Sequence, residues 1–110
     1  MSHIAEIVSF HLKPDVNESD FLDSSQPVDA FCRKQPGFVS RHLMRDEAGG
    51  WIDYIEWTDA GAASHAAKLM PKAEGVGPFL TAIDMSTLSM RHLHIRHSAQ
   101  SDSDSNAHDA

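Results

Sequence analysis

Four strand-like segments, separated by helix-like ones, limit how this chain of 110 residues can fold. Runs of β-branched, aromatic and other apolar residues predict strands over residues 4–12, 38–46, 51–57 and 86–96. The turn "EAGG" lies between the second and third of these, and it predicts a hairpin. The segment between the first two strands and the segment after the third have the apolar spacing of helices.

The first helix-like segment, "NESDFLDSSQPVDAFCRKQPG", contains a proline that would remove a backbone hydrogen bond from a continuous helix. We therefore expect Asn17 or Ser19 to cap one helix, a break before Pro27, and Gly37 after the end of the second. The other helix, "AGAASHAAKLM", follows Asp59, a favourable cap, and its small side chains predict close packing on a sheet. A short helical turn is expected around "PFLTAID".

The order β-α-β-β-α-β predicts an α+β, ferredoxin-like fold, in which a four-stranded antiparallel sheet carries its helices on one face. Alternation within each strand, however, puts apolar residues on both faces. In the second strand, for example, Phe38 and Met44 are placed on one face, and Val39 and Leu43 on the other. Because helices can cover only one face, we predict a homodimer that buries the open sheet face.

The last 13 residues, "SAQSDSDSNAHDA", contain no large apolar side chain, which predicts a folded domain over residues 1–97 and a disordered acidic and polar tail over 98–110. The net charge is −7, and the three tail aspartates leave about −4 on the domain. This acidity argues against nucleic acid or an anionic membrane as a partner. With no apolar run of about 20 residues, no basic leader and the single cysteine Cys32, a cytoplasmic protein without an internal disulfide is expected.

The segment "SMRHLHIRH" contains three histidines near the end of the last predicted strand. His92 and His94 are two residues apart and share a strand face, whereas His97 points to the other face. A catalytic metal usually needs about three protein ligands, so we expect no metal here. A metal site, a metal-free role in a pocket and a surface or interface position remain open alternatives. In a pocket, proton transfer or orientation of a substrate oxygen is expected, with His42 and Tyr54 as the nearest helpers.

Three further residues allow two interpretations each. Glu6 lies among apolar residues, where its carboxylate is either paired with Arg41 or Arg91, which we favour, or shifted toward neutrality and usable as an acid or base. Cys32 is expected to be buried and inert rather than activated by neighbouring cations. His65 lies beside the alanine stripe of its helix, so we expect it to be exposed rather than to contact a heme or substrate.

The segment "PGFVSR", the hairpin into "WIDYIEW", the alanine-rich helix and "PFLTAIDMSTLSMRHLHI" together resemble the dimeric α+β barrel superfamily over about residues 3–96. Within it, the chain is most similar to antibiotic-biosynthesis-monooxygenase-like and related uncharacterised small proteins. The resemblance implies a ligand pocket between sheet and helices in each subunit. Cofactor-independent oxygenases of this group use Asn, Trp and Tyr; Trp57 and Tyr54 match in type. Heme-degrading relatives use Asn, Trp and His; Trp57 and His65 match in type and rough location. The first strand offers no Asn to either.

Two classes of function follow. The first is a cofactor-independent monooxygenase or isomerase that acts on a small apolar or aromatic metabolite, with no metal and no cofactor. Its catalytic residues are unassigned, and its expected substrate-binding residues are His42, Tyr54, Trp57, His92 and His94. The alternative is a non-catalytic dimeric ligand-binding or stress-associated module, and a heme-binding or heme-degrading protein is a second alternative. Histidines that converge in one closed cavity would favour the enzyme, and scattered histidines would favour the module.

Overall fold

The structure, a computed structural model, describes residues 2–101. Residues 98–101, where the predicted tail begins, form neither helix nor strand. The rest of the predicted tail lies outside the described residues. No helix in the described part of the chain is long and apolar enough to cross a membrane.

The strands form one antiparallel sheet in the order β2-β3-β1-β4. They are β1 (Ile4–Leu12), β2 (Phe38–Arg45), β3 (Trp51–Trp57) and β4 (Ile83–His94). Strands β1 and β3 lie in the centre, so their inward-facing side chains have a strand on either side. β4 begins three residues earlier than predicted, because Ile83 and Asp84 already pair with the end of β1. The predicted ferredoxin-like α+β fold is confirmed.

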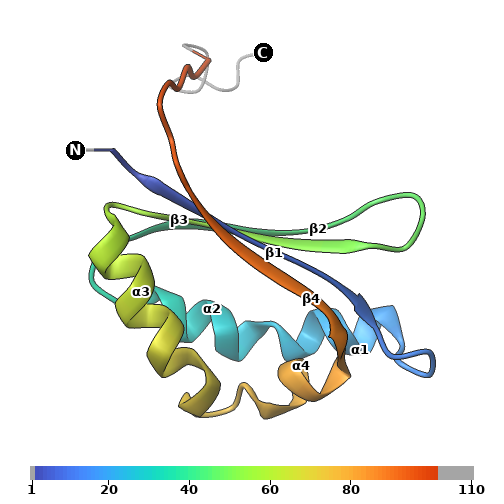
Figure 1. Ribbon diagram of the computed structural model, residues 1–110. Helices are drawn as coiled ribbons and strands as arrows, with labels where there is room; N and C mark the ends of the chain where they lie inside the picture. The colour runs from blue at the N-terminus through green and yellow to red at the C-terminus, as the bar shows by residue number, and fades with distance from the viewer. Residues whose placement is uncertain (1, 102–110) are drawn as a thin grey trace.

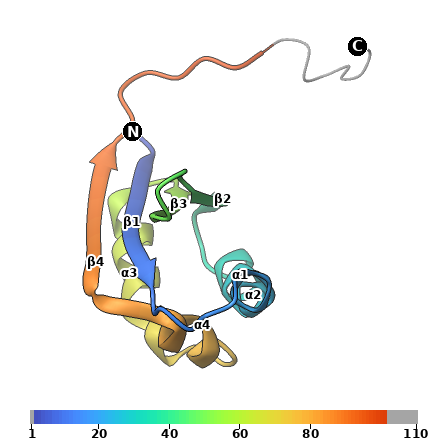
Figure 2. The same cartoon turned by 90° about the vertical axis from the view of Figure 1, so that its right-hand side faces the viewer.

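The helices lie on one side of the sheet, as Figures 1 and 2 show. They are α1 (Glu18–Ser24), α2 (Gln26–Arg33), α3 (Ala60–Leu69), the short 3-10 helix η1 (Met70–Lys72) and α4 (Gly77–Ala82). Asn17 caps α1 by accepting a hydrogen bond from the Asp20 backbone, and Asp59 caps α3 by accepting one from Ala62. The predicted break before Pro27 falls at Ser25, between α1 and α2.

Gly37 is required where the chain turns from α2 into β2. Its φ of +84° is in the left-handed region that favours glycine. A Cβ atom at this position would also lie 2.5 Å from the Cβ of Ala62, which is closer than real side chains approach. The small residues of α3 therefore allow this helix to lie against the loop as well as the sheet.

A β-bulge in β2 makes the predicted faces of this strand wrong. The register shifts between Phe38 and Ser40, so that Phe38 lies opposite Trp57 and Leu43 lies opposite Asp53. Phe38 and Leu43 therefore both pack toward the helices, whereas Met44 lies on the open face. A bulge inserts one extra residue, which reverses the alternation of every side chain beyond it.

Four aromatic rings of the core contact one another at the end of the sheet near α1 and α4. The rings of Phe21 and Phe79 stack with centroids 4.8 Å apart, and Phe21 meets Trp51 edge to face at 5.0 Å. Phe10 contacts both phenylalanines. This cluster closes one end of the space between sheet and helices, and a cavity remains beside it.

Candidate functional site

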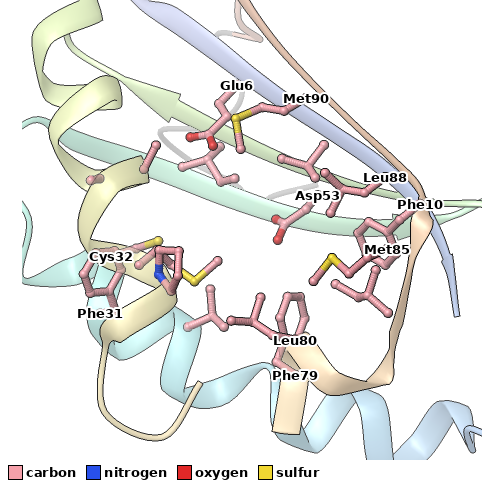
Figure 3. A pocket seen from close by; sticks show the side chains of 18 of the residues that line it. Glu6, Phe10, Phe31, Cys32, Asp53, Phe79, Leu80, Met85, Leu88 and Met90 are labelled. Atoms are coloured by element: carbon pink, nitrogen blue, oxygen red, sulfur yellow. The ribbon is translucent and has the colours of Figure 1, made fainter. Parts of the chain in front are cut away.

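A cavity of about 210 Å³ lies between the sheet and the helices (Figure 3). Its walls come from β1, β3, β4, α2, α3, η1 and α4, and they are almost entirely apolar. The aromatic and sulfur-containing residues of the wall include Phe10, Phe31, Phe79, Met70, Met85 and Met90. Met85 and Met90 are also about half exposed, so the cavity reaches the surface along β4.

Two carboxyl groups, those of Glu6 and Asp53, lie in this apolar wall. Figure 3 shows both pointing into the space between sheet and helices. β1 contributes Glu6 and β3 contributes Asp53, and alternation along each strand places them on the same face as the surrounding apolar side chains. Both residues are buried. An ionised carboxylate without a partner is costly in such surroundings, so what each group contacts determines what it can do.

Asp53 is neutralised by Arg41. The guanidinium donates two parallel hydrogen bonds to this carboxylate, from Nε to Oδ1 at 2.9 Å and from Nη2 to Oδ2 at 2.8 Å. Nη1 donates to Asp29 Oδ1 and to Ser25 Oγ, both at 2.7 Å. Arg41 thereby joins β2 and β3 to the break between α1 and α2. Because the guanidinium binds Asp53 on one side and Asp29 and Ser25 on the other, we assign the ion pair a structural role.

Glu6 has no such cation. Trp57 Nε1 donates a hydrogen bond of 2.9 Å to Glu6 Oε1, and Glu6 Oε2 lies 3.9 Å from His92 Nε2. Burial raises the pKa of the Glu6 carboxyl, and the Trp57 hydrogen bond and the His92 ring oppose this effect only in part. A carboxyl group of this kind can accept a proton from a bound molecule and return it. It does so at a pH closer to neutrality than the pH at which an exposed glutamate exchanges its proton.

The favoured pairing of Glu6 with Arg41 or Arg91 is therefore wrong. Arg41 is fully occupied by two aspartates and a serine. Arg91 lies opposite Ile7 in the β1–β4 register, on the open face of the sheet. The other interpretation of Glu6, a carboxyl shifted toward neutrality, agrees with the structure.

The structure divides the five expected substrate-binding residues between the two faces of the sheet. Trp57 lines the cavity, and His92 lies opposite Glu6 on the same face of the sheet. His94 lies on the same face, opposite Ile4, with its Nδ1 atom 3.1 Å from Ser2 Oγ. His42 and Tyr54 lie opposite each other on the open face, their ring centroids 6.4 Å apart. A ligand in the cavity can reach Trp57, but the sheet separates it from His42 and Tyr54.

The resemblance implied two residue pairs, Trp57 with Tyr54 and Trp57 with His65, and in neither pair do both residues line the cavity. Trp57 lies in the cavity and Tyr54 on the other side of the sheet, so the oxygenase pair is split. His65 is exposed on α3, as expected, and is not part of the cavity wall, so the heme-type pair with Trp57 is split as well.

Cys32 is buried in the cavity wall, as predicted. Burial raises the pKa of its thiol to about 12, so the sulfur keeps its proton and is a poor nucleophile near neutral pH. Among residues 2–101, no three His, Cys, Asp or Glu side chains gather closely enough to hold a metal ion.

The sequence did not single out Asp53, and Arg41, which was expected to pair with Glu6, is bound to Asp53 instead. The signal for Asp53 was present in "WIDYIEW", where it occupies the same apolar face as Trp51, Ile55 and Trp57. It is the same pattern that singled out Glu6 in the first strand. Nothing in the sequence, however, indicates whether Arg41 forms its ion pair with Glu6 or with Asp53.

No family model matches the chain, and no curated protein matches it either. Solved structures do. SnoaB, a cofactor-independent oxygenase from Streptomyces nogalater, is 20% identical, with 91% of this chain and 97% of SnoaB covered and a TM-score of 0.61. A monooxygenase from the gene ActVA-Orf6 of Streptomyces coelicolor, in complex with Nanaomycin D, is 15% identical, with coverage of 91% and 93% and a TM-score of 0.69.

A protein of unknown function from Nitrosomonas europaea, NE2512, is 12% identical, with 92% of this chain and 96% of that protein covered and a TM-score of 0.64. At these identities the similarity establishes the fold. The similarity covers at least 91% of this chain and at least 93% of the other chain in each of these comparisons. The chain therefore has the ferredoxin-like α+β fold of antibiotic-biosynthesis-monooxygenase-like proteins, as its sequence predicted.

Proposed function

We propose that the protein is a cofactor-independent monooxygenase-like enzyme, which uses Glu6 as a base on a small apolar or aromatic metabolite. The observation that carries this proposal is the Glu6 carboxyl, which is buried in an apolar cavity, held by Trp57 and without an arginine or lysine partner among residues 2–101. Its fold is shared with a cofactor-independent oxygenase and a monooxygenase, which supports oxygen chemistry as the use of such a base.

The proposed reaction takes its electrons from the substrate. Glu6 removes a proton from an acidic C–H group, and the carbanion passes electrons to O₂ and forms a carbon–oxygen bond. Cleavage of the O–O bond leaves one oxygen as a carbonyl and releases the other as water, so that a CH₂ group and O₂ become C=O and H₂O. The oxidation of the carbon by four electrons balances the reduction of O₂. The apolar wall favours a neutral substrate, because a charged group without a partner is costly there.

The cavity limits the substrate class. Its volume of about 210 Å³ is below the range of roughly 300–1,000 Å³ that is usual for drug-sized ligands, so the substrate is small. Its lining residues include no lysine, arginine or histidine that could bind an anion. An aromatic ketone, with its acidic CH₂ group at Glu6 and its rings against Phe31, Phe79 and the methionines, fits these surroundings.

A non-catalytic ligand-binding module is the second candidate, because the histidines do not converge. Of the five expected ligand contacts, only Trp57 belongs to the cavity wall. By the criterion set from the sequence, this scatter favours the module, and the support for an enzyme comes from Glu6 instead. Turnover distinguishes the two candidates, and a requirement for O₂ distinguishes an oxygenase from an isomerase.

Anthrone, an apolar aromatic ketone with an acidic CH₂ group, is a suitable probe. We expect the protein to accelerate O₂ uptake and the formation of anthraquinone, followed by an oxygen electrode and by absorbance. Ala67→Leu narrows the cavity and should slow the reaction, whereas the matched change Ser64→Leu on the exposed side of α3 should not. If O₂ uptake equals that of buffer alone while anthrone still quenches tryptophan fluorescence, the protein binds the ligand without catalysis. This result would favour the ligand-binding module over the enzyme.

We further propose that the protein is a homodimer through its open sheet face, where Val39, Met44 and Ile52 are exposed. Sedimentation equilibrium at micromolar concentration should give twice the chain mass of 12.1 kDa. Ile52→Glu should give a monomer, because it places a charge in the buried interface. Leu22→Glu, an equally exposed apolar position on α1, should leave the dimer intact. A monomeric wild-type protein would refute this proposal.

A further inference from the structure

We propose that His92 is the proton relay of the site, which carries protons between the buried Glu6 carboxyl and solvent. This inference rests on the proposed role of Glu6 as a base. A buried base that has taken a proton must lose it before the next turnover, and the apolar side chains around Glu6 cannot receive it. The question is therefore which side chain connects Glu6 to the surface.

The register of the sheet places His92 at Glu6. The two residues are direct cross-strand neighbours in the β1–β4 pair, on the face of the sheet that carries the cavity. Glu6 Oε1 is occupied by the Trp57 N–H, which leaves Oε2 as the free oxygen, and this atom is the one that faces His92 Nε2 at 3.9 Å. A small rotation of the imidazole, or one bridging water, completes a hydrogen bond over this distance.

The two side chains differ in access to solvent in the way that a relay requires. The Glu6 side chain is 8% exposed and that of His92 is 29% exposed. Imidazole can accept a proton on one ring nitrogen and release one from the other, and it does so near neutral pH. His92 can therefore receive a proton from the buried carboxyl and release it on the exposed side of β4.

The other groups that face Glu6 cannot serve. Asp53 is bound to Arg41 by two hydrogen bonds, and Cys32 on α2 keeps its proton, since the pKa of its thiol is about 12. The indole of Trp57 can only donate a hydrogen bond, so it cannot accept a proton from Glu6. α3 contributes the apolar Ala66 and Ala67 to this part of the wall.

In the proposed reaction the relay carries two protons out to solvent and two protons back for each turnover. The CH₂ group of the substrate gives up two protons, and the departing oxygen takes up two when it leaves as water. Each substrate proton passes to Glu6 Oε2, then to His92 Nε2, and then to solvent, and the same path returns protons to the departing oxygen. Protons balance, and neither residue is changed at the end of the cycle.

The first test needs no substrate. In protein labelled with ¹³C at the glutamate carboxyl carbons, the Glu6 resonance followed against pH should show an inflection from the ionisation of His92. This inflection should vanish in His92→Gln. It should persist in His94→Gln, the matched control, which lies on the same strand and face but opposite Ile4. A Glu6 curve that is identical in wild type and His92→Gln overturns the proposal.

The second test follows proton transfer itself. Under argon, the protein should catalyse exchange of the anthrone CH₂ hydrogens for deuterium from D₂O, read by mass spectrometry. His92→Gln should slow this exchange by roughly tenfold or more, and free imidazole in the buffer should restore it, while His94→Gln should exchange at the wild-type rate. A purely structural role for His92 would not be rescued by imidazole.

The outcomes separate the two proposals. Exchange by the wild type that His92→Gln leaves at full rate overturns the relay and keeps Glu6 as the base. A wild type that exchanges no deuterium overturns the proposed function, and the relay falls with it, whatever the titration shows. Slow exchange in His92→Gln that imidazole fails to restore assigns His92 to packing and also overturns the relay.

Discussion

Replacement of Arg41 by Met is expected to lower the free energy of unfolding by about 3–5 kcal/mol, the usual cost of removing one partner of a buried ion pair. The side chain of Asp53 is 8% exposed, and its carboxylate accepts two hydrogen bonds from this guanidinium. Without Arg41 it would be a buried charge with no cation. Ser25, at the break between α1 and α2, would lose its partner too.

Denaturation by guanidinium chloride measures this loss, and Arg45→Met is the matched control. Arg45 lies on the same strand, its side chain is 46% exposed, and its contact with Glu18 is 3.5 Å long, so a change within about 0.5 kcal/mol is expected. Adding Asp53→Leu to Arg41→Met should recover most of the loss, because it removes the unpaired charge. Equal midpoints for Arg41→Met and Arg45→Met would show that the buried network contributes nothing to stability.

Glu6→Gln is expected to reduce the rate of anthrone oxidation by about 10²–10⁴-fold, the range typical of a lost general base. Glutamine has nearly the same volume and can still accept the Trp57 hydrogen bond, so the cavity should keep its shape. Glu56→Gln is the control, because Glu56 lies on the open face, where it contacts His3. A Glu6→Gln variant with wild-type activity would remove Glu6 from the mechanism.

The pH dependence of the wild-type rate, and of the stability of Glu6→Gln relative to wild type, provides a second measurement. Burial raises the pKa of Glu6, so the wild-type rate should rise with pH through a value above that of an ordinary glutamate, as the base becomes ionised. The folded state also binds this proton more tightly than the unfolded state. The resulting stability is present below the ordinary pKa of glutamate and is lost as pH rises through the raised pKa. Glu6→Gln should therefore gain stability relative to wild type as pH rises.

The helix and strand boundaries were largely predictable because they depend on neighbours in sequence. Asn17 and Asp59 cap helices with their own side chains, and the break before Pro27 follows from a missing backbone donor. The burial of Glu6 and Cys32 follows from the periodicity of their own segments, since each shares a face with large apolar residues. Such features require no knowledge of what packs against them.

The candidate site was less predictable, because its contacts join residues that are far apart in sequence. The bulge after Phe38 could not be seen in "FVSRHLMR", and it alone moved Met44 to the open face. Arg41 was an equally good partner for either buried carboxylate by sequence. It binds Asp53 because β2 lies next to β3, whereas β1, which carries Glu6, is one strand further away.

Within each regular strand, the sequence by itself determined which residues share a face, including a carboxylate among apolar neighbours in β1 and two histidines on one face of β4. Alternation is a local property of an extended chain, so it can be read without a partner. Only the tertiary structure decided that His92 stands opposite Glu6, that Trp57 holds its other oxygen, and that His42 and Tyr54 lie on the other side. Strand order and register decide these contacts, and both depend on how the whole sheet packs against its helices.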